Sequence, residues 1–228
     1  MPLKKSVGNM YPWVTHTHSH LGGKCQHECK YCYVQTGRCK GLARYQGEVR
    51  LIEKEFDVNY GKGKTIFIEH MNDIFGPGVT PTMIDRILEH CRAWPENTYV
   101  FQSKYPMGFH WIDKAMPEGA IIGTTIETNR DIPGVSNAPA PLFRFQEMVM
   151  FDWPRKFVTI EPVLDFDVDI LAGWIMQINP EFLNLGADSK NNDLPEPTVE
   201  KVMALTEKLH EHGIELREKH NLERLKAK

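Results

Sequence analysis

Short runs of β-forming residues alternate with longer stretches of helical periodicity along this chain. The β-rich runs are 13–20, 65–69, 98–102, 120–127, 156–161, 182–186 and, more weakly, 214–217. The helical stretches begin with one that opens at Thr80 and continue with 142–151, 168–178 and 198–212. Strands that alternate with helices in this way form βα units, so the pattern predicts an α/β fold with a mostly parallel sheet.

Length and charge limit the classes of function. The 228 residues lie near the lower end of the size range of α/β barrels, and we expect one domain over 1–228. Lys plus Arg number 27 against 30 Asp plus Glu, so no global basic field points to nucleic acid or an anionic membrane. No apolar run approaches the ~20 residues of a membrane helix. The chain begins without a signal-peptide core and has an odd number of cysteines, so we expect a cytoplasmic protein.

Three cysteines, Cys25, Cys29 and Cys32, follow the first β-rich run with the spacing C-x3-C-x2-C. No fourth cysteine at matching spacing completes the set, although His20 or His27 could complete a zinc site. A disulfide is the weakest alternative. Three thiolates can also hold three irons of a [4Fe-4S] cluster and leave the fourth iron open to another ligand.

Polar side chains follow five of the β-rich runs, at the point where each run ends. These polar segments are 69–73, 102–104, 127–130, 161 and 187–190. Ligands of parallel α/β sheets and barrels bind at the carboxyl ends of the strands. A polar-lined site at these ends is therefore expected, with a solvated rim as the alternative for any single segment.

The cysteine loop, followed by repeated βα units, resembles the radical S-adenosylmethionine (SAM) superfamily, and Tyr31 before the third cysteine fits its pattern. The resemblance covers nearly the whole chain and implies a partial (β/α)6 barrel, with 214–217 as a candidate seventh strand. Four segments are similar to phage-type radical-SAM proteins that are distantly related to spore photoproduct lyase. They are His16-Thr17-His18, Met71-Asn72-Asp73-Ile74-Phe75, Ile160-Glu161-Pro162 and Leu185-Gly186-Ala187-Asp188-Ser189.

This resemblance implies a reaction. Cys25, Cys29 and Cys32 would hold a [4Fe-4S] cluster, and the amino and carboxylate groups of SAM would chelate its open iron. An electron from an external one-electron reductant would then cleave SAM and release a 5′-deoxyadenosyl radical that abstracts hydrogen from the substrate. The protein would position the reactants and exclude competing reactions.

The resemblance also implies contacts with SAM. Tyr33 occupies the position that lies near adenine in the family. The family's Gly-Gly-Glu-like segment, which holds the methionine ammonium, is replaced here by 69–73, where Asn72 or Asp73 offers an acceptor.

Three further residues at strand ends are candidate SAM contacts. Thr125 and Glu127 suit the ribose or carboxylate side of SAM, because a hydroxyl and a carboxylate offer a donor and acceptors at short reach. Glu161 stands where the fifth strand passes the adenine in the family. For each of these, a surface or supporting polar role is an equally good interpretation.

His16, His18 and His20 alternate along the first β-rich run and should project to one side of a strand. They are interpreted as hydrogen-bonding or proton-relay groups below the cluster, with an exposed or partly packed strand face as the alternative. A separate metal site on these three is a weaker hypothesis.

The remaining cysteines predict a single cluster, because no cysteine follows Cys91. Cys91 falls on an apolar helical stripe and is predicted to be part of the core. Cys39 lies in the basic segment 37–40, where its thiol could donate a hydrogen atom to a product radical. An idle surface thiol is the alternative.

The substrate is the least constrained prediction. The cations at or beyond strand ends are Lys104, Arg130, Lys190, Arg217 and Lys219. Their clustering suggests an anionic substrate. The resemblance favours a nucleobase or modified nucleotide, including one within DNA. A second set of cations with an aromatic residue follows the cysteine loop, which is a modest footprint for phosphates and stacked bases. This basic segment comprises Arg38, Lys40, Arg44, Tyr45 and Arg50.

Two alternatives to this substrate stay open. The first is a radical-SAM enzyme that acts on a free small molecule or amino-acid-like group. The second is a non-catalytic iron–sulfur or zinc protein that binds a partner.

Overall fold

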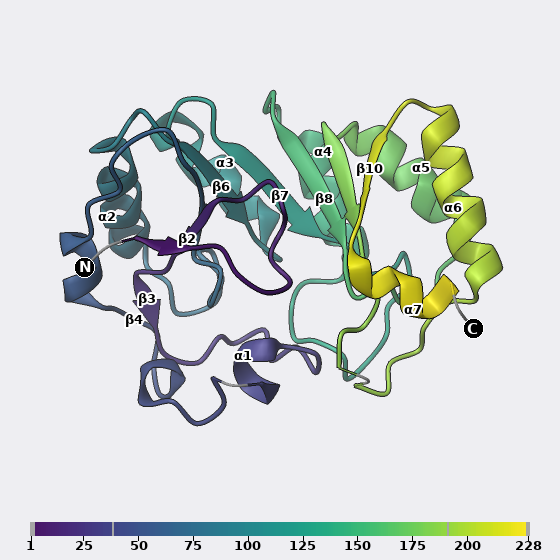
Figure 1. The fold of residues 1–228 in the computed structure, drawn as a ribbon, viewed down its shortest axis with the longest axis horizontal. Coiled ribbons are helices and arrows are strands. Elements are labelled where there is room, and N and C mark those ends of the chain that lie inside the picture. The colour runs from purple at the N-terminus through teal and green to yellow at the C-terminus, as the bar shows by residue number, and fades with distance from the viewer. Residues whose placement is uncertain (1–2, 38, 191, 227–228) are drawn as a thin grey trace. The chain divides into compact units, whose positions relative to one another are not determined.

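The computed structural model describes residues 3–37, 39–190 and 192–226, and shows an α/β protein (Figure 1). The strands are β1 Lys4–Lys5, β2 His16–His18, β3 Leu21–Gly22, β4 Arg50–Leu51, β5 Thr65–Ile68, β6 Thr98–Gln102, β7 Ile121–Thr125, β8 Lys156–Ile160, β9 Phe182–Leu185 and β10 Glu215–Glu218. The α-helices are α1 Tyr33–Thr36, α2 Pro81–Arg92, α3 Phe109–Ile112, α4 Pro141–Met150, α5 Val168–Ile178, α6 Val199–Glu211 and α7 Glu223–Lys226. Short 3-10 helices lie at Ala43–Tyr45, Glu53–Asp57, Pro106–Gly108, Asp113–Ala115 and His220–Leu222.

The chain divides into two compact units, and the passage between them lies within β7. Unit 1 comprises Met1–Glu28 and Cys32–Ile122, and unit 2 comprises Cys29–Tyr31 and Gly123–Lys228. The central part of the cysteine loop therefore belongs to the second unit and its flanks to the first. A single domain over the whole chain stays a prediction.

The main sheet of the fold is mostly parallel. In unit 1, β2 pairs with β5 and β5 with β6, both parallel, and β1 adds an antiparallel edge to β2. In unit 2, β8, β9 and β10 are parallel neighbours. The strand order is β1-β2-β5-β6-β7-β8-β9-β10, and β3 and β4 form a separate antiparallel pair. The predicted α/β fold is confirmed, and the weakly predicted seventh strand is β10.

Unit 1 shows how the sequence sets a helix of the core. The Oγ1 of Thr80 accepts a hydrogen bond from the amide of Met83, and Pro81 occupies the first turn of α2. The buried stripe of this helix consists of Ile84, Ile87, Leu88 and Cys91. Cys91 is therefore a core residue, as its periodicity predicts.

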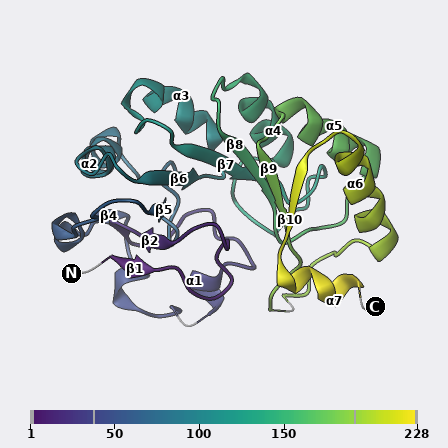
Figure 2. The same cartoon turned by 45° about the horizontal axis from the view of Figure 1, so that its top comes forward.

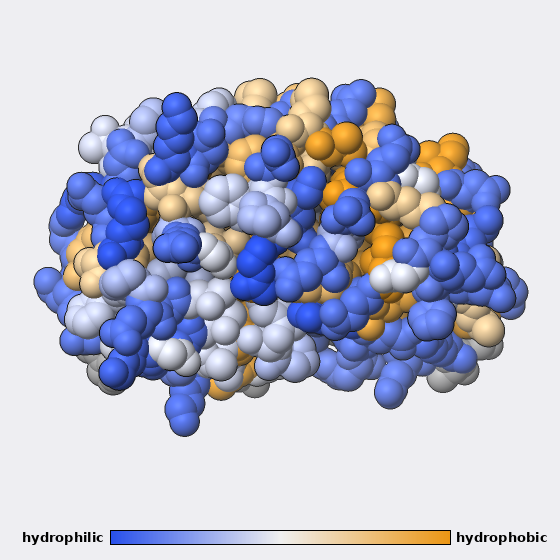
Figure 3. All heavy atoms as spheres, turned by 90° about the horizontal axis from the view of Figure 1, so that it is seen from above, coloured by the Kyte–Doolittle hydropathy of each residue, from blue (hydrophilic) through white to orange (hydrophobic). Residues whose placement is uncertain are grey.

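In unit 2, α5 and α6 pack side by side, and α6 also contacts β10 (Figures 1 and 2). Helix α5 ends at Ile178, and Asn179 caps it in a left-handed conformation. The buried residues of α5 are Leu171, Ala172, Ile175 and Ile178. Hydrophilic side chains cover much of the face shown in Figure 3, where apolar side chains are also exposed. The large exposed apolar residues of unit 2 are Leu142, Val149, Met150, Ile170 and Met203.

None of the helices in the described ranges has the length and apolar character needed to cross a membrane.

Candidate functional site

The loop cysteines are free thiols. Cys25 and Cys32 are half-buried in unit 1, and Cys29 is buried in unit 2. No disulfide joins any of the five cysteines in the structure. Three thiols on one short loop are suitable ligands for an iron–sulfur cluster or, with a fourth donor, for zinc.

Three contacts hold the segment Cys29–Tyr31 within unit 2. The amide of Lys30 donates to the carbonyl of Val135 at 2.8 Å. The Sγ of Cys29 lies 3.2 Å from the Oγ of Ser136, and the hydroxyl of Tyr31 donates to a carboxylate oxygen of Glu127. The position of the central cysteine in unit 2 is therefore supported by its own contact and by those of the two residues that follow it.

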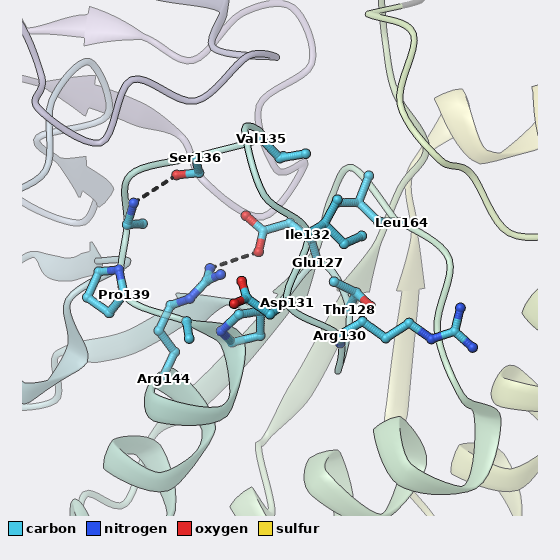
Figure 4. Close-up of a pocket in the computed structure, with 13 residues that line it drawn as sticks. Glu127, Thr128, Arg130, Asp131, Ile132, Val135, Ser136, Pro139, Arg144 and Leu164 are labelled. Atoms are coloured by element: carbon cyan, nitrogen blue, oxygen red, sulfur yellow. Dashed lines mark hydrogen bonds and ion pairs between the residues drawn. The ribbon is translucent and has the colours of Figure 1, made fainter.

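Glu127 and Arg144 form a buried ion pair at the end of β7. Each is only 3% exposed, and Nη1 of Arg144 lies 2.8 Å from Oε2 of Glu127 (Figure 4). The same nitrogen donates to the carbonyl of Thr125 at 2.5 Å. Arg144 on helix α4 is therefore linked to the end of strand β7. Its positive charge compensates the carboxylate of Glu127, which accepts a hydrogen bond from Tyr31 of the cysteine loop.

Tyr31 is a neutral hydrogen-bond donor at this position. Burial raises the pKa of its hydroxyl well above the ordinary value, and the negative charge of Glu127 raises it further. The contact between Tyr31 and Glu127 is thus a hydrogen bond from a neutral phenol to a carboxylate.

A pocket opens beside this ion pair in unit 2 (Figure 4). Its lining combines charged and small apolar residues: Glu127, Thr128, Arg130, Asp131, Ile132, Val135, Ser136, Ala138, Pro139, Ala140, Pro141, Arg144 and Leu164. Ser136, whose Oγ accepts from the amide of Ala138 at 3.1 Å, therefore both contacts Cys29 and lines the pocket.

Glu161 follows β8 and is held by two donors of unit 2. Its carboxylate accepts from Nζ of Lys219 at 2.7 Å and from Nδ2 of Asn221 at 2.8 Å. Gly186 permits this arrangement, because a Cβ there would lie 2.8 Å from Oδ1 of Asn221 and 3.0 Å from Oε1 of Glu161. The close approach of Asn221 and Glu161 therefore explains why residue 186 is a glycine.

The predicted cations are less available than the sequence suggests. Arg130 pairs with Asp165 and Asp167, and Lys219 pairs with Glu161. Arg217 pairs with Glu215, and its guanidinium lies over the aromatic ring of Phe182. Lys190 is exposed, and the backbone amide of Lys104 donates to Asp73 in unit 1. The expected cationic surface is therefore largely compensated by carboxylates of the chain itself.

In unit 1, Asp73 organises the segment after β5. Its carboxylate accepts from His27 at 2.8 Å, from Ser103 at 2.6 Å and from the amides of Phe75 and Lys104 at 2.9 and 2.8 Å. Burial acts to raise the pKa of Asp73, but the hydrogen bond and charge of His27 and the bond from Ser103 hold it below the ordinary value. The protein thus uses four acceptor positions of this carboxylate.

Tyr33 and Asn72 are the other predicted SAM contacts in unit 1. The hydroxyl of Tyr33 donates to the carbonyl of His70 at 2.8 Å and to Sδ of Met71 at 2.9 Å. Nδ2 of Asn72 donates to the carbonyl of Gly23 at 3.3 Å. Unit 1 therefore brings the residue after the last loop cysteine together with the polar segment that follows β5.

The predicted sites fall into two groups. Unit 1 contains Cys25, Cys32, Tyr33, Cys39, Asn72, Asp73 and Lys104. Unit 2 contains Cys29, Thr125, Glu127, Arg130, Glu161, Lys190 and Lys219. Each unit thus holds at least one loop cysteine together with candidate SAM contacts.

The sequence suggests Cys39 as a hydrogen donor and the basic segment after the cysteine loop as a footprint for phosphates and bases. Cys39 is half-buried. In the basic segment, Arg38 lies outside the described residues, whereas Arg44 pairs with Glu55 and Arg50 donates to backbone carbonyls. Much of this segment's charge therefore serves local structure.

His18 and His20 lie in a buried cluster, but His16 does not share it. Nδ1 of His16 contacts Oγ1 of Thr15 at 2.9 Å instead. The third imidazole beside His18 and His20 comes from His90 on α2.

Sequence reasoning missed Arg144, Ser136, Asn221 and His90. Arg144 and His90 lie inside helices, where a charged or polar residue normally indicates a solvated face. Ser136 and Asn221 lie in segments without a motif. Gly186, by contrast, ends the β-rich run 182–186 and lies in a segment that the sequence analysis singles out.

No profile of a known protein family matches the chain. No curated protein sequence matches it either.

Solved structures of spore photoproduct lyase share this fold. A variant with bound AdoMet and dinucleoside spore photoproduct is 14% identical, with a TM-score of 0.55 over 91% of this chain and 65% of that chain. Another variant is 15% identical, with a TM-score of 0.56 over 90% and 65%. The enzyme complexed with dinucleoside spore photoproduct gives 15% identity and a TM-score of 0.54 over 89% and 63%. The chain thus spans less than two thirds of each of these proteins.

Proposed function

We propose that the chain is a radical-SAM enzyme that cleaves SAM reductively at a [4Fe-4S] cluster and abstracts hydrogen from a substrate. The observation that carries this proposal is the C-x3-C-x2-C loop of free thiols on a fold shared with spore photoproduct lyase. A zinc or non-catalytic cluster protein would have no use for an open iron position.

Cys25, Cys29 and Cys32 would hold the cluster as thiolates. When bound, the cluster would supply the electron from an external reductant that cleaves SAM to methionine and a 5′-deoxyadenosyl radical. The remaining contributions come from the chain's own residues, which bind SAM, orient it and exclude water.

Tyr33 and Asn72 are the favoured SAM contacts of unit 1. Tyr33 is 44% exposed, so its ring offers a surface for adenine while its hydroxyl is anchored to the segment after β5. Asn72 carries an amide oxygen that can accept from an ammonium group. Asp73 is better suited to hold this segment in place, because its carboxylate already accepts four hydrogen bonds within unit 1.

In unit 2, Glu127, Thr125 and Glu161 are the candidate SAM contacts. Both carboxylates are oriented by cations or amides of the protein, and each carboxylate oxygen has two lone pairs. A second hydrogen bond to a ribose hydroxyl is therefore compatible with the bonds already made.

Glu127, Arg144 and Tyr31 also position Cys29. The ion pair fixes the carboxylate, the carboxylate accepts from Tyr31, and Tyr31 is two residues from the central cysteine. This sequence of contacts supports the conformation of the loop in unit 2.

We favour a nucleobase or modified nucleotide, free or within DNA, as the substrate. The support is the dinucleoside spore photoproduct held by the structurally similar enzyme, together with the exposed Lys190. Lys104 is a further candidate substrate contact. Arg130 and Lys219 are paired with carboxylates of the chain, so they would have to exchange these partners for substrate. Cys39 is kept as a proposed hydrogen donor to the product radical, and a reducing compartment such as the cytoplasm suits its free thiol.

Cluster assembly tests the metal assignment. Wild-type chain, Cys29→Ala and Cys91→Ala are reconstituted anaerobically with iron and sulfide, and bound iron and sulfide are measured per chain. We expect about four of each in wild type and Cys91→Ala and a large loss in Cys29→Ala. Zinc in place of iron, or equal iron in Cys29→Ala, would contradict the assignment.

Oligonucleotide binding tests the substrate class. Fluorescence anisotropy of a labelled DNA oligomer is measured over a series of salt concentrations with reconstituted chain. A polymer substrate predicts affinity that falls as salt rises. No binding at low salt would eliminate DNA and favour a free nucleotide or another small molecule.

A further inference from the structure

Unit 1 contains three histidines, none of them in the cysteine loop, whose imidazole rings converge. His18 lies on β2, His20 follows it by two residues, and His90 lies on α2. One ligand nitrogen from each ring lies within 4.8 Å of the others. His18 is 6% exposed and His20 is fully buried, so the cluster belongs to the interior of the unit.

The second nitrogen of each ring faces an oxygen that can only accept. Nε2 of His18 lies 3.1 Å from the carbonyl of Glu55, and Nε2 of His90 lies 3.0 Å from the carbonyl of Val58. These two nitrogens must therefore carry protons, which leaves the lone pair of each neutral ring on its Nδ1.

His20 is oriented in the same way by a carboxylate. Its Nδ1 lies 2.8 Å from Oε1 of Glu69, which also accepts from the amide of His20 at 2.7 Å. The other oxygen of Glu69 accepts from the amide of Leu21 at 3.2 Å. With Nδ1 of His20 donating to this fixed carboxylate, the ring presents its Nε2 lone pair to the cluster.

These assignments leave more lone pairs than protons in the centre of the cluster. Nε2 of His20 and Nδ1 of His90 lie 2.8 Å apart, so two acceptors face each other. The hydroxyl of Tyr60, 3.1 Å from Nε2 of His20, brings one proton to this pair. A cation between the two rings would remove the remaining repulsion.

His18 and His20 are almost completely buried, and His90 is half-buried. A neutral imidazole whose other nitrogen donates to a carboxylate or carbonyl is the usual state of a metal-ligating histidine.

We propose that His18, His20 and His90 bind a divalent transition-metal ion, with zinc as the best match, at a site separate from the cysteine loop. Zinc–nitrogen bonds of about 2.0–2.1 Å in a tetrahedron place the nitrogens roughly 3.4 Å apart. This lies between the 2.8 Å that separates Nε2 of His20 from Nδ1 of His90 and the 4.8 Å within which all three ligand nitrogens lie. The hydroxyl of Tyr60, 3.1 Å from Nε2 of His20, is a candidate fourth donor. The buried position favours a structural role that ties strand β2 to helix α2.

The test uses full-length chain whose cysteine loop has first been loaded with iron and sulfide. Zinc is added, excess zinc is removed with a weak chelator, and bound zinc is counted. X-ray absorption at the zinc edge then reports the ligand shell. We expect one zinc per chain, surrounded by nitrogen and oxygen only. If no zinc is retained, the rings of His20 and His90 share a proton instead of a metal ion, and the proposal is overturned. Sulfur among the zinc ligands would also overturn it.

Variants make the assignment specific. His90→Gln and His18→Gln should each weaken zinc binding at least about tenfold, whereas His16→Gln, on the same strand but outside the cluster, should bind like wild type. Added zinc should raise the thermal midpoint of wild type and His16→Gln and leave that of His90→Gln unchanged. Equal zinc affinity in all four proteins would refute the site, and the wild-type absorption spectrum decides the matter if a variant fails to fold. Because no step requires SAM, this result is independent of the proposed function.

Discussion

Replacement of Arg144 by methionine tests whether the buried ion pair at the end of β7 stabilises the fold. Methionine keeps much of the apolar volume of the side chain and removes the guanidinium that compensates the 3% exposed Glu127. Removal of one partner of a buried ion pair costs about 3–5 kcal/mol, because the remaining charge stays desolvated. The lost bond to the carbonyl of Thr125 adds about 1 kcal/mol.

A double-mutant cycle separates the ion pair from the packing. Glu127→Leu with Arg144→Met removes both charges, so its cost should come mainly from the hydroxyl of Tyr31, which loses a carboxylate acceptor. We expect about 1–3 kcal/mol for this double variant, less than for Arg144→Met alone. The coupling energy of the cycle should therefore reach at least about 2 kcal/mol.

The assay is urea unfolding of the apo chain followed by circular dichroism, with the denaturant slope compared among variants. Arg144→Lys is the matched control, because it keeps the charge and changes only the hydrogen-bond geometry, and it should cost less than methionine. If Arg144→Met loses less than about 1 kcal/mol, or the two substitutions are additive, the buried pair does not have the role assigned to it.

Two further predictions concern other parts of the chain. Gly186→Ala adds a Cβ 2.8 Å from Oδ1 of Asn221 and 3.0 Å from Oε1 of Glu161, so it should cost about 1–3 kcal/mol in urea unfolding; an unchanged midpoint would contradict this close approach. Burial lowers the pKa of His70 from 6.5 to about 4, so the folded chain keeps the ring neutral while the unfolded chain binds a proton below about pH 6.5. Stability should thus decrease by about 2 kcal/mol at pH 5 through this group, and His70→Gln should flatten that dependence whereas the exposed His212→Gln should not. Identical pH profiles for wild type and His70→Gln would show the argument to be wrong.

The main elements were predictable because they follow local periodicity. Helix α2 combines a threonine cap, a proline in its first turn and a buried stripe, all of which can be read without tertiary information. The weak strand β10 is a harder case. Its residues are only partly buried, so its apolar signal was faint, and pairing with β9 is what defines it.

The surroundings of the candidate site were less predictable, because they depend on contacts between distant segments. Arg144 is 17 residues from its partner Glu127 and lies in a helix where a solvated charge is the simplest interpretation. The same holds for His90, which joins His20 across 70 residues of chain. Charges at strand ends were misleading for the opposite reason, since the aspartates that neutralise Arg130 lie 35 and 37 residues away.

Cleavage of SAM by the reconstituted chain tests the central claim most directly. Anaerobic wild-type chain, Cys29→Ala and Cys91→Ala are reduced with dithionite in the presence of SAM, and 5′-deoxyadenosine and methionine are quantified by chromatography. A radical-SAM enzyme predicts equal amounts of the two products from wild type and Cys91→Ala, and neither above background from Cys29→Ala. An iron–sulfur-loaded wild-type chain that leaves SAM intact under these conditions would contradict the account.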